Sequence, residues 1–105
     1  MELFGRSLGI GERTTLRQKV ASYPDGTPIS VAVRAVNGVG DGPVISLLGV
    51  QHGDEYCGME VVNRLLGGLD PESLSGTIIG VPVSNPLAFN AGMRFSPLRP
   101  RATRT

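Results

Sequence analysis

The sequence predicts an α/β fold in which a β-hairpin is followed by a strand–helix–strand (βαβ) unit. Residues 14–35 alternate apolar and polar side chains on either side of a strong turn signal, which is typical of a hairpin. Residues 44–83 place an amphipathic helical pattern between two apolar runs. That order predicts two parallel strands joined by a crossover helix. A chain of 105 residues has room for one domain with a modest core.

The hairpin is predicted by a weak strand, a turn and a clearer strand. Residues 14–22 alternate weakly and are expected to form the first strand. Residues 23–26 read Tyr-Pro-Asp-Gly, in which proline fixes φ at the first corner and glycine accepts a positive φ. Apolar residues at 29, 31, 33 and 35 then predict a half-buried second strand. Residues 1–13 have no period, and we expect an extended or frayed lead-in.

The βαβ unit is predicted to begin after a glycine-rich loop at residues 37–43. Residues 44–50 are almost continuously apolar, as expected of a strand covered on both faces. An amphipathic helix should run from Asp54 or Glu55 to Leu66, with Asp54 as its N-cap and the glycine pair at 67–68 ending it. A turn over residues 70–76, a parallel strand over 77–83 and a loop over 87–97 complete the prediction.

Composition excludes several classes of protein. The single cysteine excludes an intramolecular disulfide, and no apolar run approaches the roughly 20 residues of a membrane-spanning helix. The last eight residues hold three of the ten basic residues and no acid, which leaves residues 1–97 with a formal charge of −2. A slightly acidic domain with a short basic end does not favour nucleic-acid binding, because the basic residues cover no face of the fold. We expect a soluble cytoplasmic protein without nucleic-acid or membrane partners, of unknown oligomeric state.

The character of the sequence changes at residue 98. Residues 98–105 have neither an apolar period nor a helix-capping pattern, so we expect a basic disordered tail after a domain of residues 1–97. A sheet protein rarely ends directly after two parallel strands. The composition therefore predicts a truncated chain or an altered reading frame at this end.

The chemistry is expected at the turn after the first apolar strand. This turn holds the only histidine, His52, and Glu55 follows three residues later. Imidazole nitrogen and carboxylate oxygen both bind zinc, at roughly 2.0–2.2 Å, and Gly53 would let both face one point. Asn85 and Arg94 follow the next parallel strand and should lie at the same sheet edge. From the residues alone, a capping or surface histidine remains an alternative to a metal ligand.

Two motifs resemble the succinylglutamate desuccinylase/aspartoacylase family. They are residues 49–56 (Gly-Val-Gln-His-Gly-Asp-Glu-Tyr) and residues 83–89 (Val-Ser-Asn-Pro-Leu-Ala-Phe). The family is related to the zinc carboxypeptidases and hydrolyses amide bonds of N-acyl amino acids. The resemblance covers roughly residues 26–97 and implies the N-terminal part of a zinc carboxypeptidase-like mixed sheet, with a small N-acyl amino acid as substrate.

The resemblance also implies roles for single residues. It implies zinc as the cofactor, His52 and Glu55 as zinc ligands, and Arg94 as the catalytic group that binds the substrate carbonyl and stabilises the oxyanion. Asn85 either contacts substrate or shapes the turn before Pro86. The family's Asn-Arg pair, its later histidine ligand and its general-base glutamate have no counterpart here. We therefore expect a deacylase fragment that is inactive alone; a zinc carboxypeptidase fragment and a non-catalytic α/β interaction module are the alternatives.

Overall fold

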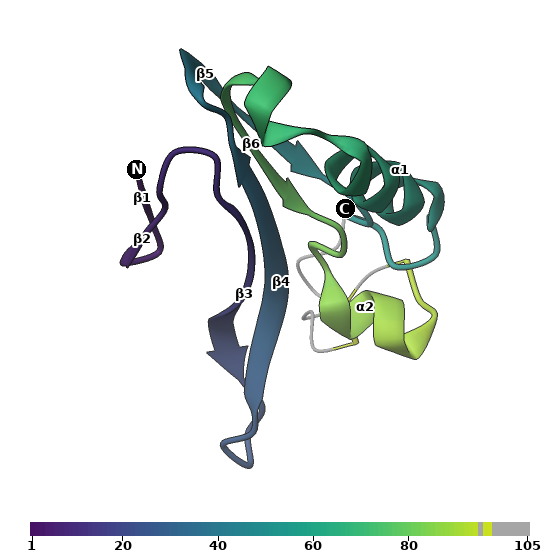
Figure 1. The fold of residues 1–105 in the computed structure, drawn as a ribbon. Helices are drawn as coiled ribbons and strands as arrows, with labels where there is room; N and C mark the ends of the chain where they lie inside the picture. The colour runs from purple at the N-terminus through teal and green to yellow at the C-terminus, as the bar shows by residue number, and fades with distance from the viewer. Residues whose placement is uncertain (95, 98–105) are drawn as a thin grey trace.

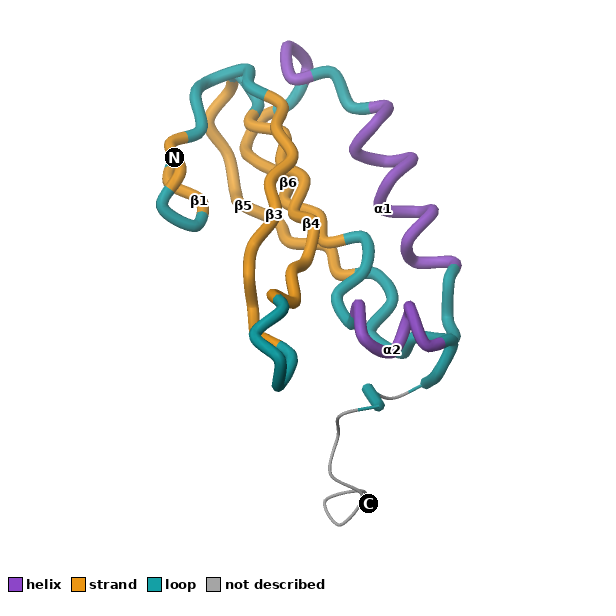
Figure 2. The backbone as a smooth tube through the Cα atoms, turned by 90° about the horizontal axis from the view of Figure 1, so that it is seen from below, coloured by secondary structure: helices purple, strands orange, loops and turns teal. Residues whose placement is uncertain are grey.

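A computed structural model describes residues 1–94 and 96–97 of the chain. Its centre is a four-stranded mixed sheet of order β3-β4-β6-β5. Helices α1 and α2 cover one face, and a small pair of strands, β1 (Glu2–Leu3) and β2 (Arg6–Ser7), lies against the other (Figure 1, Figure 2). The expected α/β class is confirmed. The predicted tail at residues 98–105 lies outside the described residues.

The predicted hairpin is confirmed. Strands β3 (Arg13–Ser22) and β4 (Pro28–Asn37) pair antiparallel along nearly their whole length. At the turn, the Gly26 amide donates to the Tyr23 carbonyl at 2.8 Å, and Gly26 has a φ of 90°, which few residues other than glycine adopt. The Thr27 amide donates to the Asp25 carboxylate at 2.9 Å. This hydrogen bond favours the charged form and lowers the pKa of Asp25 below its ordinary value.

The predicted βαβ unit is confirmed, with its strands displaced toward the N-terminus. Strand β5 (Gly40–Leu48) leads to helix α1 (Cys57–Gly68), a short 3-10 helix η1 (Pro71–Ser73) and strand β6 (Ser75–Val81). Strand β6 pairs parallel with β5 and antiparallel with β4. The crossover unit is thus attached to the hairpin through β6, which makes the sheet mixed.

Strand β5 differs from its prediction in burial and in extent. Val44, Ile45 and Leu48 are 55%, 49% and 55% exposed, so the expected coverage of both faces is wrong. The reason is strand order, because β5 lies at the edge of the sheet. The loop predicted for residues 37–43 is also wrong from Gly40 onward, because β5 begins at Gly40 and pairs with Ser75 of β6.

Helix α1 begins later and ends differently from its prediction. Its N-cap is Tyr56, which makes no side-chain capping bond, so the expected Asp54 cap is wrong. The helix includes both glycines at 67–68 and ends at Leu69 in an extended conformation. The Arg13 guanidinium of β3 donates to the carbonyl oxygens of Leu66 and Leu69. A distant arginine therefore satisfies carbonyl groups that a left-handed glycine was expected to satisfy.

The loop predicted for residues 87–97 contains a helix, α2 (Pro86–Ala91). The Asn85 side chain caps its N-terminus, Pro86 occupies the first turn, and Gly92 ends it with a φ of 66°. Proline inside the start and glycine just past the end form a recognised helix signature. The signature is present in the sequence, but it encloses only six residues and so lacks an apolar period.

Two clusters of buried side chains hold the layers together. Leu3 and Leu8 pack against Val33 and Ala35 on the face opposite the helices. Of the two states expected for residues 1–13, extended or frayed, the frayed one is therefore wrong, and short extended strands are present. Val36, Val62 and Leu66 form the second cluster, between the sheet and α1. Among the described residues, no helix has the length and apolar character needed to cross a membrane.

Leu66 should be the side chain on which the packing of α1 most depends, because it is 0% exposed. We expect Leu66→Ala to lower the free energy of unfolding by about 2–5 kcal/mol. The neighbouring Leu65 is 43% exposed, and Leu65→Ala should cost less than about 1 kcal/mol. Urea unfolding followed by circular dichroism measures both. Equal losses for the two variants would contradict the described orientation of α1.

Candidate active site

The turn between β5 and α1 has a strained backbone. Val50 has a φ of 47°, which is rare for a β-branched residue, and its side chain is buried. Hydrogen bonds from the segment after β6 hold this conformation: Asn85 donates its amide to the Val50 carbonyl at 3.1 Å, and Ser84 donates to the Gly49 carbonyl at 2.9 Å. Such conformations persist where surrounding contacts impose them, and they cluster at functional sites.

Asn85 connects this turn to α2. Its side-chain nitrogen donates to the Gln51 carbonyl at 3.1 Å, and its side-chain oxygen accepts from the Ala88 amide at 3.3 Å. One amide group therefore bridges the residue before His52 and the first turn of the helix. The turn-shaping role considered for Asn85 is present in the structure, and a substrate contact remains a prediction.

Gly53 allows α2 to pack directly on the turn. A Cβ at this position would lie 2.1 Å from the Met93 carbonyl oxygen and 2.2 Å from the Ala88 carbonyl carbon. The Gly53 amide donates to the Arg94 carbonyl at 3.2 Å. These are backbone atoms, so no rotamer change could make room for a side chain. Glycine at 53 is thus needed for a close approach.

The approach brings together three predicted site residues. The His52 Nδ1 atom lies 2.7 Å from Glu55 Oε1, and Arg94 Nη1 lies 3.7 Å from Glu55 Oε2. The Glu55 carboxylate therefore lies between an imidazole and a guanidinium. The three side chains are 39%, 59% and 50% exposed, in the order His52, Glu55 and Arg94, so a solute could reach them.

His52 and Glu55 have the chemistry of a metal-ligand pair. Ligand atoms of a tetrahedral zinc ion lie roughly 3.3 Å apart, given bonds of about 2.0–2.2 Å. The observed distance of 2.7 Å would have to widen by about 0.6 Å for the two atoms to bind one zinc ion. Across residues 1–94 and 96–97, no group of three or more His, Cys, Asp or Glu side chains could hold a metal. His52 and Glu55 therefore remain two candidate ligands.

Sequence reasoning missed two contacts that fix this geometry. The Tyr56 and Phe89 rings pack edge to face with centroids 5.5 Å apart, joining the start of α1 to α2. The bridge from Asn85 to the Gln51 carbonyl is the other. The Asn-Pro pair and Gly92 could have revealed α2, and α2 would have indicated the ring contact. No sequence signal identifies the Gln51 carbonyl as an acceptor.

Comparison with known proteins gives a family match and a curated relative. The model of the succinylglutamate desuccinylase/aspartoacylase catalytic domain matches residues 41–102. A curated N-alpha-acetyl-L-2,4-diaminobutyric acid deacetylase from Halomonas elongata is 39% identical over 71 residues, which are 68% of this chain. The chain spans about a fifth of that relative's length, since the aligned region is 19% of it.

Solved structures agree with this match. An aspartoacylase family protein from Mesorhizobium loti superposes with a TM-score of 0.71 and 36% identity, over 81% of this chain and 27% of that one. The ectoine utilization protein EutE (DoeB) from Ruegeria pomeroyi gives 0.68 and 28%, over 87% of this chain and 29% of that one. The family model covers more than half of the residues, and the expected fold is confirmed. The chain belongs to the succinylglutamate desuccinylase/aspartoacylase family.

Proposed function

We propose that this chain contributes part of the active site of a zinc-dependent hydrolase that cleaves the amide bond of small N-acyl amino acids. In this proposal, residues 1–97 are the N-terminal portion of the catalytic domain. The observation that supports it best is the position of Glu55, whose two carboxylate oxygens contact His52 and Arg94. The two proposed metal ligands, His52 and Glu55, and the cation Arg94 thus lie together in one partly exposed cluster.

Each residue has a distinct role in the proposal. His52, as the neutral imidazole, and Glu55, as the carboxylate, hold the metal. Bound zinc supplies a water of lowered pKa and polarises the acyl oxygen. Arg94, beside Glu55, would supply a fixed positive charge that stabilises negative charge developing on the acyl oxygen. Removing a group of this kind typically costs a few kcal/mol of transition-state stabilisation.

Asn85 acts through the backbone in this proposal. Its side chain fixes the Gln51 carbonyl and the start of α2 at once, and so it sets the position of the adjacent His52. It is a positioning residue. A hydrogen-bonded scaffold of this kind lowers the reorganisation that ligand side chains need before they bind metal.

The substrate class rests on the family and on named relatives. The Halomonas elongata relative is named for removal of an acetyl group from an amino acid. A metallopeptidase from Shewanella denitrificans has 24% identity and a TM-score of 0.53, a likeness that extends to the fold alone. A small acylated amino acid is therefore better supported than a peptide. The cytoplasmic location expected from the sequence remains a prediction.

Zinc titration tests the proposal directly. We expect the purified chain to bind zinc at least about tenfold more tightly than His52→Ala or Glu55→Gln, because each variant loses one of two ligands. Glu60→Gln is the matched control, since Glu60 pairs with Arg64 on the exposed side of α1 and should leave binding unchanged. Calorimetry gives the dissociation constants. Equal zinc binding by wild type and His52→Ala would favour a non-catalytic module.

Gly53→Ala should weaken both zinc binding and stability. Its methyl group would overlap backbone atoms of Ala88 and Met93, so α2 must move away from the turn. Strain of this kind typically costs about 1–3 kcal/mol. Gly67→Ala is the control, because a Cβ there meets nothing within 4 Å and alanine favours a helix. If the two variants have the same melting temperature and the same zinc dissociation constant, α2 does not pack on this turn.

The 105-residue chain should not hydrolyse N-acyl amino acids by itself. Catalytic zinc normally has three protein ligands, and this sequence contains a single histidine. The expected result is no release of amine from N-acetyl amino acids above a zinc-only blank. Release that depends on both zinc and His52 would show that two protein ligands are enough, and would overturn this part of the proposal.

A further inference from the structure

The hairpin presents a row of cations toward the helices. Cross-strand partners lie on the same face of a sheet, and Arg13, Arg17 and Lys19 of β3 oppose Val36, Ala32 and Ser30 of β4. Val36 packs against α1, which identifies this face as the one that the helices cover. Arg34 of β4 alternates onto the same face and binds Asn63 of α1.

Among the described residues, Arg13 and Arg34 donate hydrogen bonds to α1, whereas the side chains of Arg17 and Lys19 have no such partner. Arg13 donates to carbonyl groups at the end of α1, and Arg34 donates to the Asn63 side chain at 2.8 Å. Within residues 1–94 and 96–97, the Arg17 guanidinium forms neither a salt bridge nor a hydrogen bond. An arginine that faces a neighbouring element without an acceptor presents its donors to a solute.

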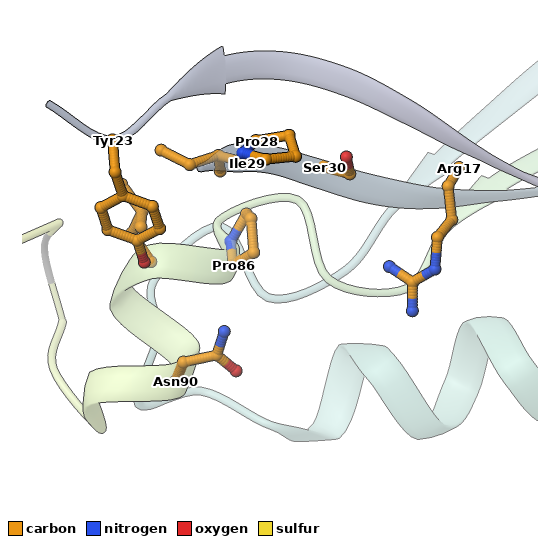
Figure 3. A pocket seen from close by; sticks show the side chains of 8 residues that line it. Arg17, Tyr23, Pro28, Ile29, Ser30, Pro86 and Asn90 are labelled. Carbon is orange, nitrogen blue, oxygen red and sulfur yellow. The ribbon is translucent and has the colours of Figure 1, made fainter. Parts of the chain in front are cut away.

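A pocket of about 260 Å³ lies beside this guanidinium, between the end of the hairpin and α2. Arg17 and Asn90 extend toward it from opposite sides, and Tyr23 lies at the end away from Arg17 (Figure 3). Apolar side chains and one serine complete the lining: Pro28, Ile29, Ser30, Pro86 and Leu87. The pocket thus combines one cation, several hydrogen-bonding groups and an apolar wall.

The pocket is separate from the His52 turn. Helix α2 lines it with Pro86, Leu87 and Asn90, whereas the Ala88 backbone contacts Gly53 of the turn. The short helix therefore stands between the two places. A ligand in the pocket would contact α2 without occupying the candidate active site.

We propose that this pocket is a second binding site, for a small organic carboxylate with a short apolar body. The planar guanidinium of Arg17 pairs with carboxylate oxygens through two parallel hydrogen bonds. The Asn90 amide adds a donor, and the wall of Pro28, Ile29 and Pro86 covers the apolar body. The volume is below the roughly 300–1,000 Å³ of sites for drug-sized ligands, so the ligand is small.

Benzoate is the probe for this site, and benzamide is its neutral counterpart. In the ¹⁵N-labelled full chain, benzoate should shift the NMR signals of the Asn90 side-chain amide and of the Ser30 and Leu87 backbone amides in a saturable way. Benzamide should not, because it offers no carboxylate. Arg17→Met should weaken benzoate binding by about tenfold or more, as expected when a charge-assisted bidentate contact is lost.

Lys19→Met is the matched control, because Lys19 lies on the same face two residues away and does not line the pocket. It removes the same charge and should change binding less than about twofold, as expected for an exposed, screened charge. Asn90→Ala is a second variant and should also weaken binding. The proposal is overturned if benzoate causes no saturable shift, or if Arg17→Met and Lys19→Met weaken binding equally. Zinc titration of Arg17→Met should match wild type, which keeps this site distinguishable from the proposed active site.

Discussion

The parallel pairing of β5 with β6 is the constraint on which the candidate site depends. Because both strands run in the same direction, their carboxyl ends lie side by side, and the chain leaves each strand at the same edge. The Gly49 amide extends the pairing by donating to the Val81 carbonyl at 2.8 Å. Ser84 returns two hydrogen bonds to the Gly49 carbonyl, one from its amide and one from its hydroxyl. Without this pairing, the segments that carry His52 and Arg94 would not lie at the same edge of the sheet, next to Glu55.

Residues with a local signal were predictable, and residues whose state depends on strand order were not. The Tyr-Pro-Asp-Gly turn, the alternation in β4 and the helical period of α1 are local patterns, and each predicted its element. The exposure of Val44, Ile45 and Leu48 depends on which strand lies at the edge, and the order β3-β4-β6-β5 cannot be read from an apolar run. The burial of Leu3 and Leu8 depends likewise on packing against β4, which is distant in sequence.

The sequence predicted which residues form the candidate site, but not the backbone packing that holds them in position. A histidine and a glutamate three apart after a strand, and an arginine after the next strand, indicated the place where the structure has them. The sequence did not indicate that a side chain at residue 53 would clash with α2, because the clash is with the backbone of Ala88 and Met93, which are distant in sequence. It also placed the start of α1 at Asp54 or Glu55. The helix begins at Cys57, so both metal-ligand candidates belong to the turn and are free of helical geometry.

The ionic contacts at this site are poor candidates for holding the fold together. Glu55 and Arg94 are 59% and 50% exposed and their charged atoms are 3.7 Å apart, so water and salt screen most of their attraction. The same part of the chain contains the strained Val50, which lowers stability. A turn that combines backbone strain with weak ion pairs adds little to the stability of the fold. The turn holds an imidazole, a carboxylate and a guanidinium at one accessible edge, and backbone strain of this kind clusters at functional sites.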